Sequence, residues 1–245
     1  MFIVGAGGYF GYHLAKLDSE AICVDTDFDL HTMPLMKTNV IVKKRFEELL
    51  LYRDDVVVAP MLGNSYDINR PSSANTAAGE FSVIEKVVRH ADKPVLLSSH
   101  RAEGDNLYGW WLRTLERFAL YVGSLWGKDV LIIRLHNFYG DDEWERDGYI
   151  SVVKKIEMYK DKCMAFPVYI RGDKVGKRYF MNVDDAAKAV MDLIEDEKGI
   201  VELHGEELVE IDEFAEDSGL DVRYVEDKVW NRIIEPRVVY KEYIV

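Results

Sequence analysis

The sequence has few cysteines and no long apolar run, and these absences exclude several classes of protein. Its two cysteines, Cys23 and Cys163, lie in separate apolar stretches without metal-ligand spacing, so we expect neither a disulfide framework nor a metal site. No run reaches the roughly 18 apolar residues that suggest a membrane span, and the strand-like residues directly after Met1 leave no room for a signal peptide. We expect a protein of the reducing cytoplasm with no membrane partner.

Positive charge is also scarce. Lys and Arg number 31 against 44 Asp and Glu, which gives a net charge of -13, and the only basic run is the short one at 43–45. Such a chain repels phosphate polyanions, so we expect no nucleic-acid partner. Hydrophobic residues at 48% and charged residues at 31% are typical of a folded globular chain.

Short β-branched runs alternate with amphipathic stretches along the chain. The apolar runs are continuous rather than alternating, which indicates strands covered on both faces, as in a parallel sheet. The expected strands are 2–4, 21–24, 39–42, 56–58, 95–97 and 130–133, and the expected helices are 9–17, 77–90, 108–126, 150–159 and 184–195, with a further amphipathic stretch at 46–52. This order predicts a doubly wound α/β fold.

A glycine-rich turn joins the first strand to the first helix. Gly5, Gly8 and Gly11 have the spacing G-x-x-G-x-x-G, and residues without side chains at these points allow the backbone to approach a pyrophosphate. The negative charge of the pyrophosphate then lies at the positive end of the helix. The turn therefore predicts a dinucleotide site, although a glycine-rich turn of this kind also occurs without a ligand.

The nature of the dinucleotide follows from Asp25, which lies 20 residues beyond Gly5 at the end of the second strand. A carboxylate there accepts hydrogen bonds from both ribose hydroxyls of the adenosine. It repels the additional phosphate of NADP, and the following Thr26 and Asp27 provide no arginine to hold that phosphate. The expected cofactor is NAD.

The composition changes after Gly140 to a polar, acidic loop. We expect residues 1–140 to form a Rossmann-like NAD-binding domain that is completed by about 179–196. Residues 141–178 and 197–245 are then expected to form a small C-terminal substrate-binding lobe. No repeat and no flexible linker interrupts the chain.

Several segments resemble, in the same order, the motifs of the extended short-chain dehydrogenase/reductase family of nucleotide-sugar epimerases and dehydratases. The resemblance covers nearly the whole chain. The glycine turn followed by Tyr9 and Phe10 is similar to the first motif of the family, and Tyr108, Gly109 and Glu116 match its tyrosine helix. The other matching segments are 75–79, 94–99, 134–140, and 172–178 followed by 183–187.

The resemblance implies a role for each matching residue. Tyr9 and Phe10 join Gly5, Gly8 and Gly11 at the cofactor. Tyr108 is the base that takes the hydroxyl proton of the sugar while hydride passes to NAD, and Ser99 forms a hydrogen bond at that hydroxyl. Asn137 and Arg178 contact the nucleotide-sugar, with Arg178 on the diphosphate. From the residues alone, Ser99 and Asn137 also suit turns, Tyr108 suits apolar packing, and Arg178 suits a surface ion pair.

The chain departs from the family pattern at Leu112, where the family has a lysine four residues after the tyrosine. A phenol has a pKa near about 10, so Tyr108 needs a positive neighbour to act as a base at neutral pH. Arg113 points in another direction around the helix. The loop between Ser99 and Tyr108 is also short, with Glu103 where the family has a tyrosine.

Leu112 leaves three interpretations. The enzyme works with the cofactor charge alone, another cation substitutes for the lysine, or the chain binds NAD without redox turnover. A reductase of a carbonyl compound that is not a nucleotide-sugar is a further alternative. By the same resemblance we expect a homodimer through the helices at about 77–90 and 108–126, with Trp110 and Trp111 in the core or the interface.

Overall fold

The protein is described here by a computed structural model. The residues that it describes are 1–25, 39–42, 56–61, 73–104, 107–140, 168–171, 177–206, 208–210, 213, 216–217, 219, 222–225 and 241–244. The expected helix at 150–159, the stretch at 46–52 and Cys163 lie outside these residues, whereas Cys23 is buried.

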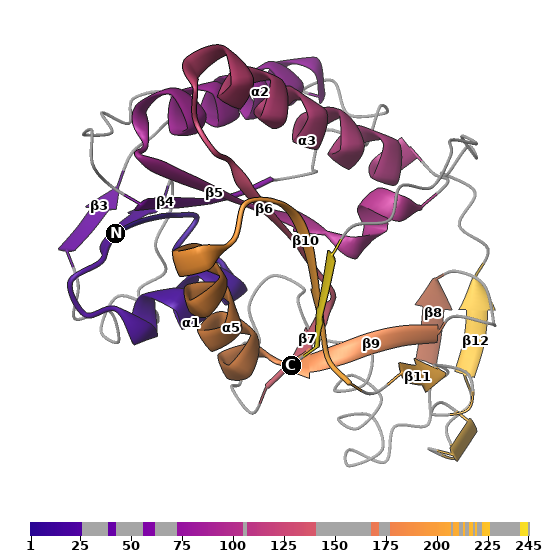
Figure 1. Ribbon diagram of the computed structural model, residues 1–245. Helices are drawn as coiled ribbons and strands as arrows, with labels where there is room; N and C mark the ends of the chain where they lie inside the picture. The colour runs from indigo at the N-terminus through magenta and orange to yellow at the C-terminus, as the bar shows by residue number, and fades with distance from the viewer. Residues whose placement is uncertain are drawn as a thin grey trace.

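An eight-stranded sheet forms the centre of the fold, and all of its neighbouring strands are parallel (Figure 1). Its strands are β1 (Phe2–Val4), β2 (Ile22–Asp25), β3 (Asn39–Val42), β4 (Val56–Pro60), β5 (Lys93–Ser99), β6 (Leu131–Leu135), β10 (Gly199–His204) and β13 (Lys241–Ile244). The order across the sheet is β13-β10-β6-β5-β4-β1-β2-β3. The chain thus builds outward in both directions from the β1–β4 pair, which confirms the doubly wound parallel sheet.

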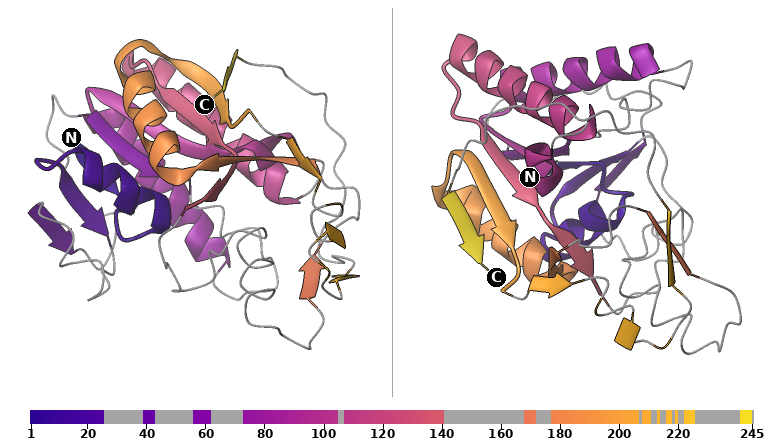
Figure 2. Two further views of the ribbon diagram at one scale, coloured as in Figure 1. Left: turned by 90° about the horizontal axis from the view of Figure 1, so that it is seen from below. Right: turned by 90° about the vertical axis from the view of Figure 1, so that its right-hand side faces the viewer.

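Helices cover both faces of this sheet (Figure 2). On one face lie α1 (Tyr9–Leu17) and α5 (Val183–Asp196), and on the other lie α2 (Ser73–His90) and α3 (Leu107–Trp126). The residues of β1 are all apolar because the strand is covered on both faces. Ile3 packs toward α1 and α5, whereas Phe2 and Val4 pack toward α2 and α3. A strand buried on both faces has no position for a polar residue.

Two smaller sheets lie beside the main one, at the lower right of Figure 1. The first contains β7 (Asn137–Tyr139), β9 (Lys177–Asn182) and β11 (Leu208–Glu210), and the second pairs β8 (Val168–Arg171) with β12 (Val222–Val225). The last strands differ from the expectation, because β10 and β13 belong to the main sheet and not to a lobe formed by 197–245. Ile200, Val201 and Leu203 of β10 are buried in the two cores, which fixes that strand beside β6. The division into two domains stays a prediction.

Candidate functional site

The glycine turn lies where the strand order reverses, between the carboxyl ends of β1 and β4. Gly5 has a φ of 78°, a left-handed conformation that favours glycine, and a Cβ on it would lie 2.9 Å from Cγ of Pro60 at the end of β4. In open α/β sheets ligands bind outside the carboxyl ends of the strands at this reversal point. The turn therefore lies where the topology provides a binding crevice.

Gly11 allows the first helix to pack directly on this turn. A Cβ on Gly11 would lie 2.3 Å from the carbonyl oxygen of Gly5 and 2.9 Å from Cα of Ala6, so no larger residue fits. The helix α1 begins after Gly8, which has no side chain to cap it. Because the first N–H groups of a helix have no acceptor within it, this end is suited to an anion.

Asp25 lies beside the turn, as its position at the end of β2 predicts. Its Oδ2 accepts a hydrogen bond of 2.8 Å from the backbone N–H of Gly7. The structure thus brings together Gly5, Gly8, Gly11 and Asp25. Together they form a glycine cradle with one carboxylate at its rim.

Tyr9 and Phe10 connect this cradle to β7. The ring of Phe10 stacks on Phe138, with centroids 4.6 Å apart and planes at 5°. The hydroxyl oxygen of Tyr9 lies 2.7 Å from the point where a Cβ on Gly140 would be. Their rings therefore pack against the strand that carries Asn137, while their backbone forms the first turn of α1.

Ser99 and Tyr108 lie on either side of a short 3₁₀ helix, η3 (His100–Glu103). Ser99 ends β5 and caps η3, because its Oγ accepts the backbone N–H of Arg101 at 3.3 Å. Tyr108 is half-buried near the start of α3. A Cβ on the adjacent Gly109 would lie 2.4 Å from the carbonyl oxygens of Arg101 and Gly104, so α3 begins in close contact with η3. The two predicted catalytic residues thus share one rigid support.

Leu112 is fully buried at 0% exposure, in the apolar cluster that includes Ala102 and Leu115. Arg113, the next residue, donates hydrogen bonds from Nη1 to the carbonyl oxygens of Ala102 and Gly104. These hydrogen bonds therefore join the Arg113 side chain to η3 and the residue that follows it. Leu112 itself therefore supplies no cation at the position where the family has a lysine.

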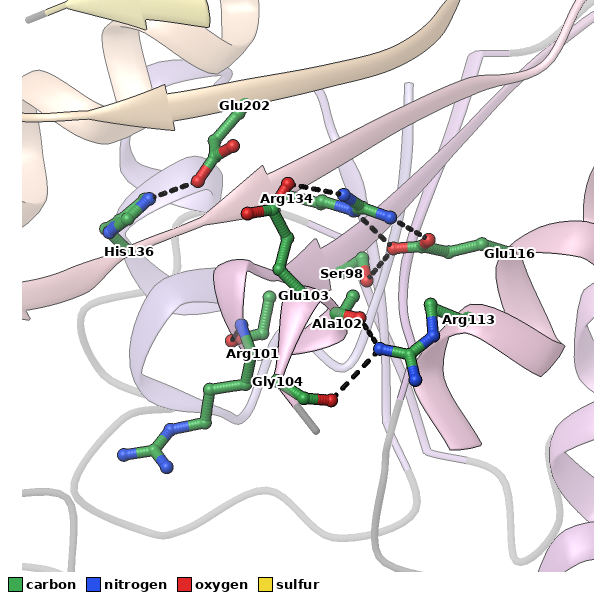
Figure 3. A network of polar contacts seen from close by, with 11 residues as sticks. Ser98, Arg101, Ala102, Glu103, Gly104, Arg113, Glu116, Arg134, His136 and Glu202 are labelled. Atoms are coloured by element: carbon green, nitrogen blue, oxygen red, sulfur yellow. Dashed lines mark hydrogen bonds and ion pairs between the residues drawn. The ribbon is translucent and has the colours of Figure 1, made fainter. Parts of the chain in front are cut away.

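A buried ionic network connects η3 and α3 with the ends of β5 and β6 (Figure 3). Nε and Nη2 of Arg134 donate to Glu116 at 3.0 and 2.7 Å, and Ser98 donates its hydroxyl to Glu116 at 2.6 Å. Glu103 lies 3.5 Å from Nη1 of Arg134. One signal for this network lies in the sequence, because Arg134 is the one charged residue of the otherwise apolar run 130–135.

Three histidines gather beside Ser99 and Asn137. The rings of His100 and His136 stack with centroids 4.3 Å apart, and the ring of His204 lies 5.4 Å from that of His136. Burial, followed by the nearby His136 and Arg101, lowers the pKa of His100 to about 3, so this ring is neutral at neutral pH. Sequence analysis missed the cluster, because its members lie far apart in the chain, in η3, between β6 and β7, and at the end of β10. Among the described residues no such group is arranged to hold a metal ion.

Asn137 and Arg178 lie on β7 and β9, which pair in parallel. Nδ2 of Asn137 donates to the carbonyl oxygen of Tyr179 at 3.5 Å, and the charge of Arg178 contributes to the lowered pKa of His100. The two predicted substrate residues therefore lie on neighbouring strands, close to the histidines that follow β5 and β6.

These features define a doubly wound α/β protein with a dinucleotide-type turn at the reversal point of its sheet. No known protein-family model and no curated protein matches the sequence. Solved structures do match. They include UDP-N-acetylglucosamine 4-epimerase from Methanobrevibacter ruminantium in complex with UDP-N-acetylmuramic acid, at 18% identity, with a TM-score of 0.69 over 93% of this chain and 85% of that one.

Two further matches have similar scores. The UDP-glucose 4-epimerase from Thermotoga maritima with UDP-glucose gives 17% identity and a TM-score of 0.70 over 92% of this chain and 84% of that one. The dTDP-glucose 4,6-dehydratase from Streptomyces venezuelae with NAD bound gives 14% identity and a TM-score of 0.71 over 93% and 84%. The chain thus has the fold of the nucleotide-sugar epimerases and dehydratases, which the sequence resemblance predicts.

Within the described residues, no helix is both long enough and apolar enough to cross a membrane.

Proposed function

We propose that this protein binds NAD and acts on a nucleotide-sugar, as an epimerase or a dehydratase. The observation that carries the proposal is the glycine cradle: Gly11 leaves no space for a Cβ, and Asp25 lies at the rim of the turn. Solved proteins of the same fold support it, since several hold NAD and nucleotide-sugars.

The residues of the cradle fit an NAD molecule. The backbone around Gly5, Gly8 and Gly11 would lie against the pyrophosphate, and the N-terminus of α1 would stabilise its charge. Asp25 would accept hydrogen bonds from the adenosine ribose and repel the phosphate of NADP. When bound, NAD supplies the acceptor for a hydride from the sugar.

The protein residues would handle the proton and the orientation of the substrate. Tyr108 takes the proton of the sugar hydroxyl, and Ser99 holds this hydroxyl by a hydrogen bond. Asn137 contacts the substrate, and the guanidinium of Arg178 binds its diphosphate. The rigid contact between η3 and α3 keeps Ser99 and Tyr108 in register.

One observation favours a second function, NAD binding without turnover. Leu112 is packed in the apolar core, and Arg113 is bonded to the carbonyl oxygens of η3. Leu112 therefore cannot stabilise a phenolate at Tyr108 as the lysine of the family does. A protein of this kind would respond to NAD and leave nucleotide-sugars unchanged.

Calorimetry with NAD, followed by turnover assays with a panel of UDP- and dTDP-sugars, tests both functions. For the enzyme we expect product formation that Tyr108→Phe abolishes and that Tyr121→Phe retains. Tyr121 is a matched control because it lies on the same helix and is 61% exposed. NAD binding with no conversion of any sugar refutes the epimerase or dehydratase and supports the second function, and no NAD binding refutes both.

We also propose that two copies associate through the outer faces of α2 and α3. Leu125 and Trp126 are large apolar residues at the end of α3 that lie exposed, at 63% and 48%. Light scattering is expected to show a dimer for the wild type and a monomer for Leu125→Asp. A wild-type monomer at high micromolar concentration refutes this association.

A further inference from the structure

His136 occupies a position that joins the main sheet to the proposed substrate residues. It lies between β6 and β7, directly before Asn137, and its backbone N–H donates to the carbonyl oxygen of Leu203 at 3.3 Å. Its side chain is only 9% exposed, and Nε2 lies 2.6 Å from Oε1 of Glu202 (Figure 3). The ring is therefore held from one edge.

The contact with Glu202 determines where the proton of the ring lies. Burial alone would raise the pKa of the Glu202 carboxyl, but the hydrogen bond and charge of His136, with Arg134 nearby, give a lowered pKa overall. An ionised carboxylate only accepts hydrogen bonds, so Nε2 must carry the hydrogen. In the neutral ring, Nδ1 then carries a lone pair and acts as an acceptor.

Nδ1 of His136 is buried and has no hydrogen-bond partner among the described residues. The neighbouring rings do not provide one. His100 lies flat against the face of His136 at 17°, the ring of Tyr179 meets it at 82°, and Nδ1 of His204 is used by the carbonyl oxygen of Gly205. A buried acceptor without a partner destabilises the unliganded protein, so a ligand group that donates a hydrogen bond to it stabilises the complex.

We propose that His136, oriented by Glu202, is a ligand-binding residue whose Nδ1 accepts a hydrogen bond from an uncharged donor of the bound ligand. The donor is an O–H or an N–H group, which a sugar hydroxyl or the carboxamide of NAD supplies. The inference rests on the proposed function for the identity of these ligands. It adds to the site a residue that no resemblance assigned.

Two substitutions distinguish the role of Nδ1 of His136 from the role of its Nε2. In His136→Asn the side-chain amide lies near the former Nδ1 and keeps an acceptor there, whereas the contact with Glu202 is lost. In His136→Gln the longer amide reaches the former Nε2 and keeps the contact with Glu202, whereas the acceptor is lost. A ligand-binding role predicts weaker binding in the Gln variant, and a purely structural role predicts the larger defect in the Asn variant.

Calorimetry compares each ligand with a fragment that lacks the donor: NAD with ADP-ribose, and UDP-glucose with UDP. If the sugar supplies the donor, His136→Gln weakens UDP-glucose about 10-fold and leaves UDP unchanged, since one such bond contributes about 1.4 kcal/mol. If the cofactor supplies it, NAD weakens and ADP-ribose does not. The Asn variant loses less affinity in either case.

The tautomer of His136 provides a second test. It is measured on the wild-type protein, so it does not require any variant to fold. Nitrogen NMR of the histidine-labelled wild type at pH 7.5 is expected to show an unprotonated Nδ1, whose signal shifts when the ligand binds. A protonated Nδ1 overturns the inference, as does equal binding by the wild type and both variants. If neither NAD nor any UDP- or dTDP-sugar binds to the wild type, the proposed function and this inference fail together.

Discussion

The buried ionic network of Glu116, Arg134 and Glu103 allows a quantitative prediction for the variant Glu116→Gln. This change removes one charge and keeps the size of the side chain. The partner Arg134 is only 3% exposed, and its two bonds to Glu116 measure 2.7 and 3.0 Å. Its guanidinium would remain buried, with the carboxylate of Glu103 at 3.5 Å and the charge of Glu202 as partial compensation. The fold must then hold a poorly compensated charge in a region of low dielectric.

Breaking one side of a buried ion pair costs about 3–5 kcal/mol, and the remaining contact with Glu103 places Glu116→Gln near the lower end, at about 3 kcal/mol. For a chain of this size each kcal/mol lowers the melting temperature by about 2–4 °C. The expected decrease is therefore at least about 6 °C. Urea titration of the purified protein measures the free energy of unfolding, and calorimetry measures the melting temperature.

Two further variants make this prediction specific. Asp129→Asn breaks an exposed pair with Lys198, whose side chains are 76% and 72% exposed, and is expected to change stability by less than about 1 kcal/mol. The double variant Glu116→Met with Arg134→Met removes both charges and is expected to be more stable than Glu116→Gln alone. A free energy of unfolding for Glu116→Gln within about 1 kcal/mol of the wild type refutes the reasoning.

The other predictions concern the cradle, the core and the response to pH. Gly11→Ala is expected to abolish NAD binding in calorimetry, and Gly8→Ala to reduce it less, because their added Cβ atoms would lie 2.3 and 3.3 Å from the carbonyl oxygen of Gly5; equal binding by both variants contradicts this. Leu112→Lys places a charge in an apolar core and should lower the melting temperature far more than Leu112→Met, and equal melting temperatures for the two variants contradict this. His100 has a folded pKa of about 3 against 6.5 for the free group, so the unfolded chain binds more protons between these values. Stability should therefore fall as the pH decreases from 6.5 toward 3, by up to about 1.4 kcal/mol per unit, and His100→Gln should reduce this slope in urea titrations.

The sequence predicted the parts of the fold that depend on local patterns. Continuous apolar runs indicated the parallel strands, and the spacing of Gly5, Gly8 and Gly11 placed the turn before its helix. The position of Asp25 relative to that turn also followed, since strands of a parallel sheet end at the same edge. To predict these features, it is enough to know residues that lie close together in the chain and the topology of a doubly wound parallel sheet.

Contacts between strands that are far apart in the sequence could not be predicted in this way. The stack of His100 on His136 and the bond from His136 to Glu202 depend on the order β5-β6-β10 across the sheet. That order places β10 in the main sheet, whereas the sequence suggested the small lobe. A short strand after a helix fits either location, and only tertiary packing decides between them.

The stack of Phe10 on Phe138 has a thermodynamic consequence. It places the beginning of α1 in direct side-chain contact with the strand that carries Asn137, so we treat the two as one packed unit. We expect a molecule that immobilises one end of this unit to restrict the motion of the other end as well. A second molecule that binds there then causes a smaller loss of conformational entropy. If NAD and a nucleotide-sugar bind as proposed, this coupling is reciprocal, so the factor by which one ligand changes the affinity for the other is the same in both directions.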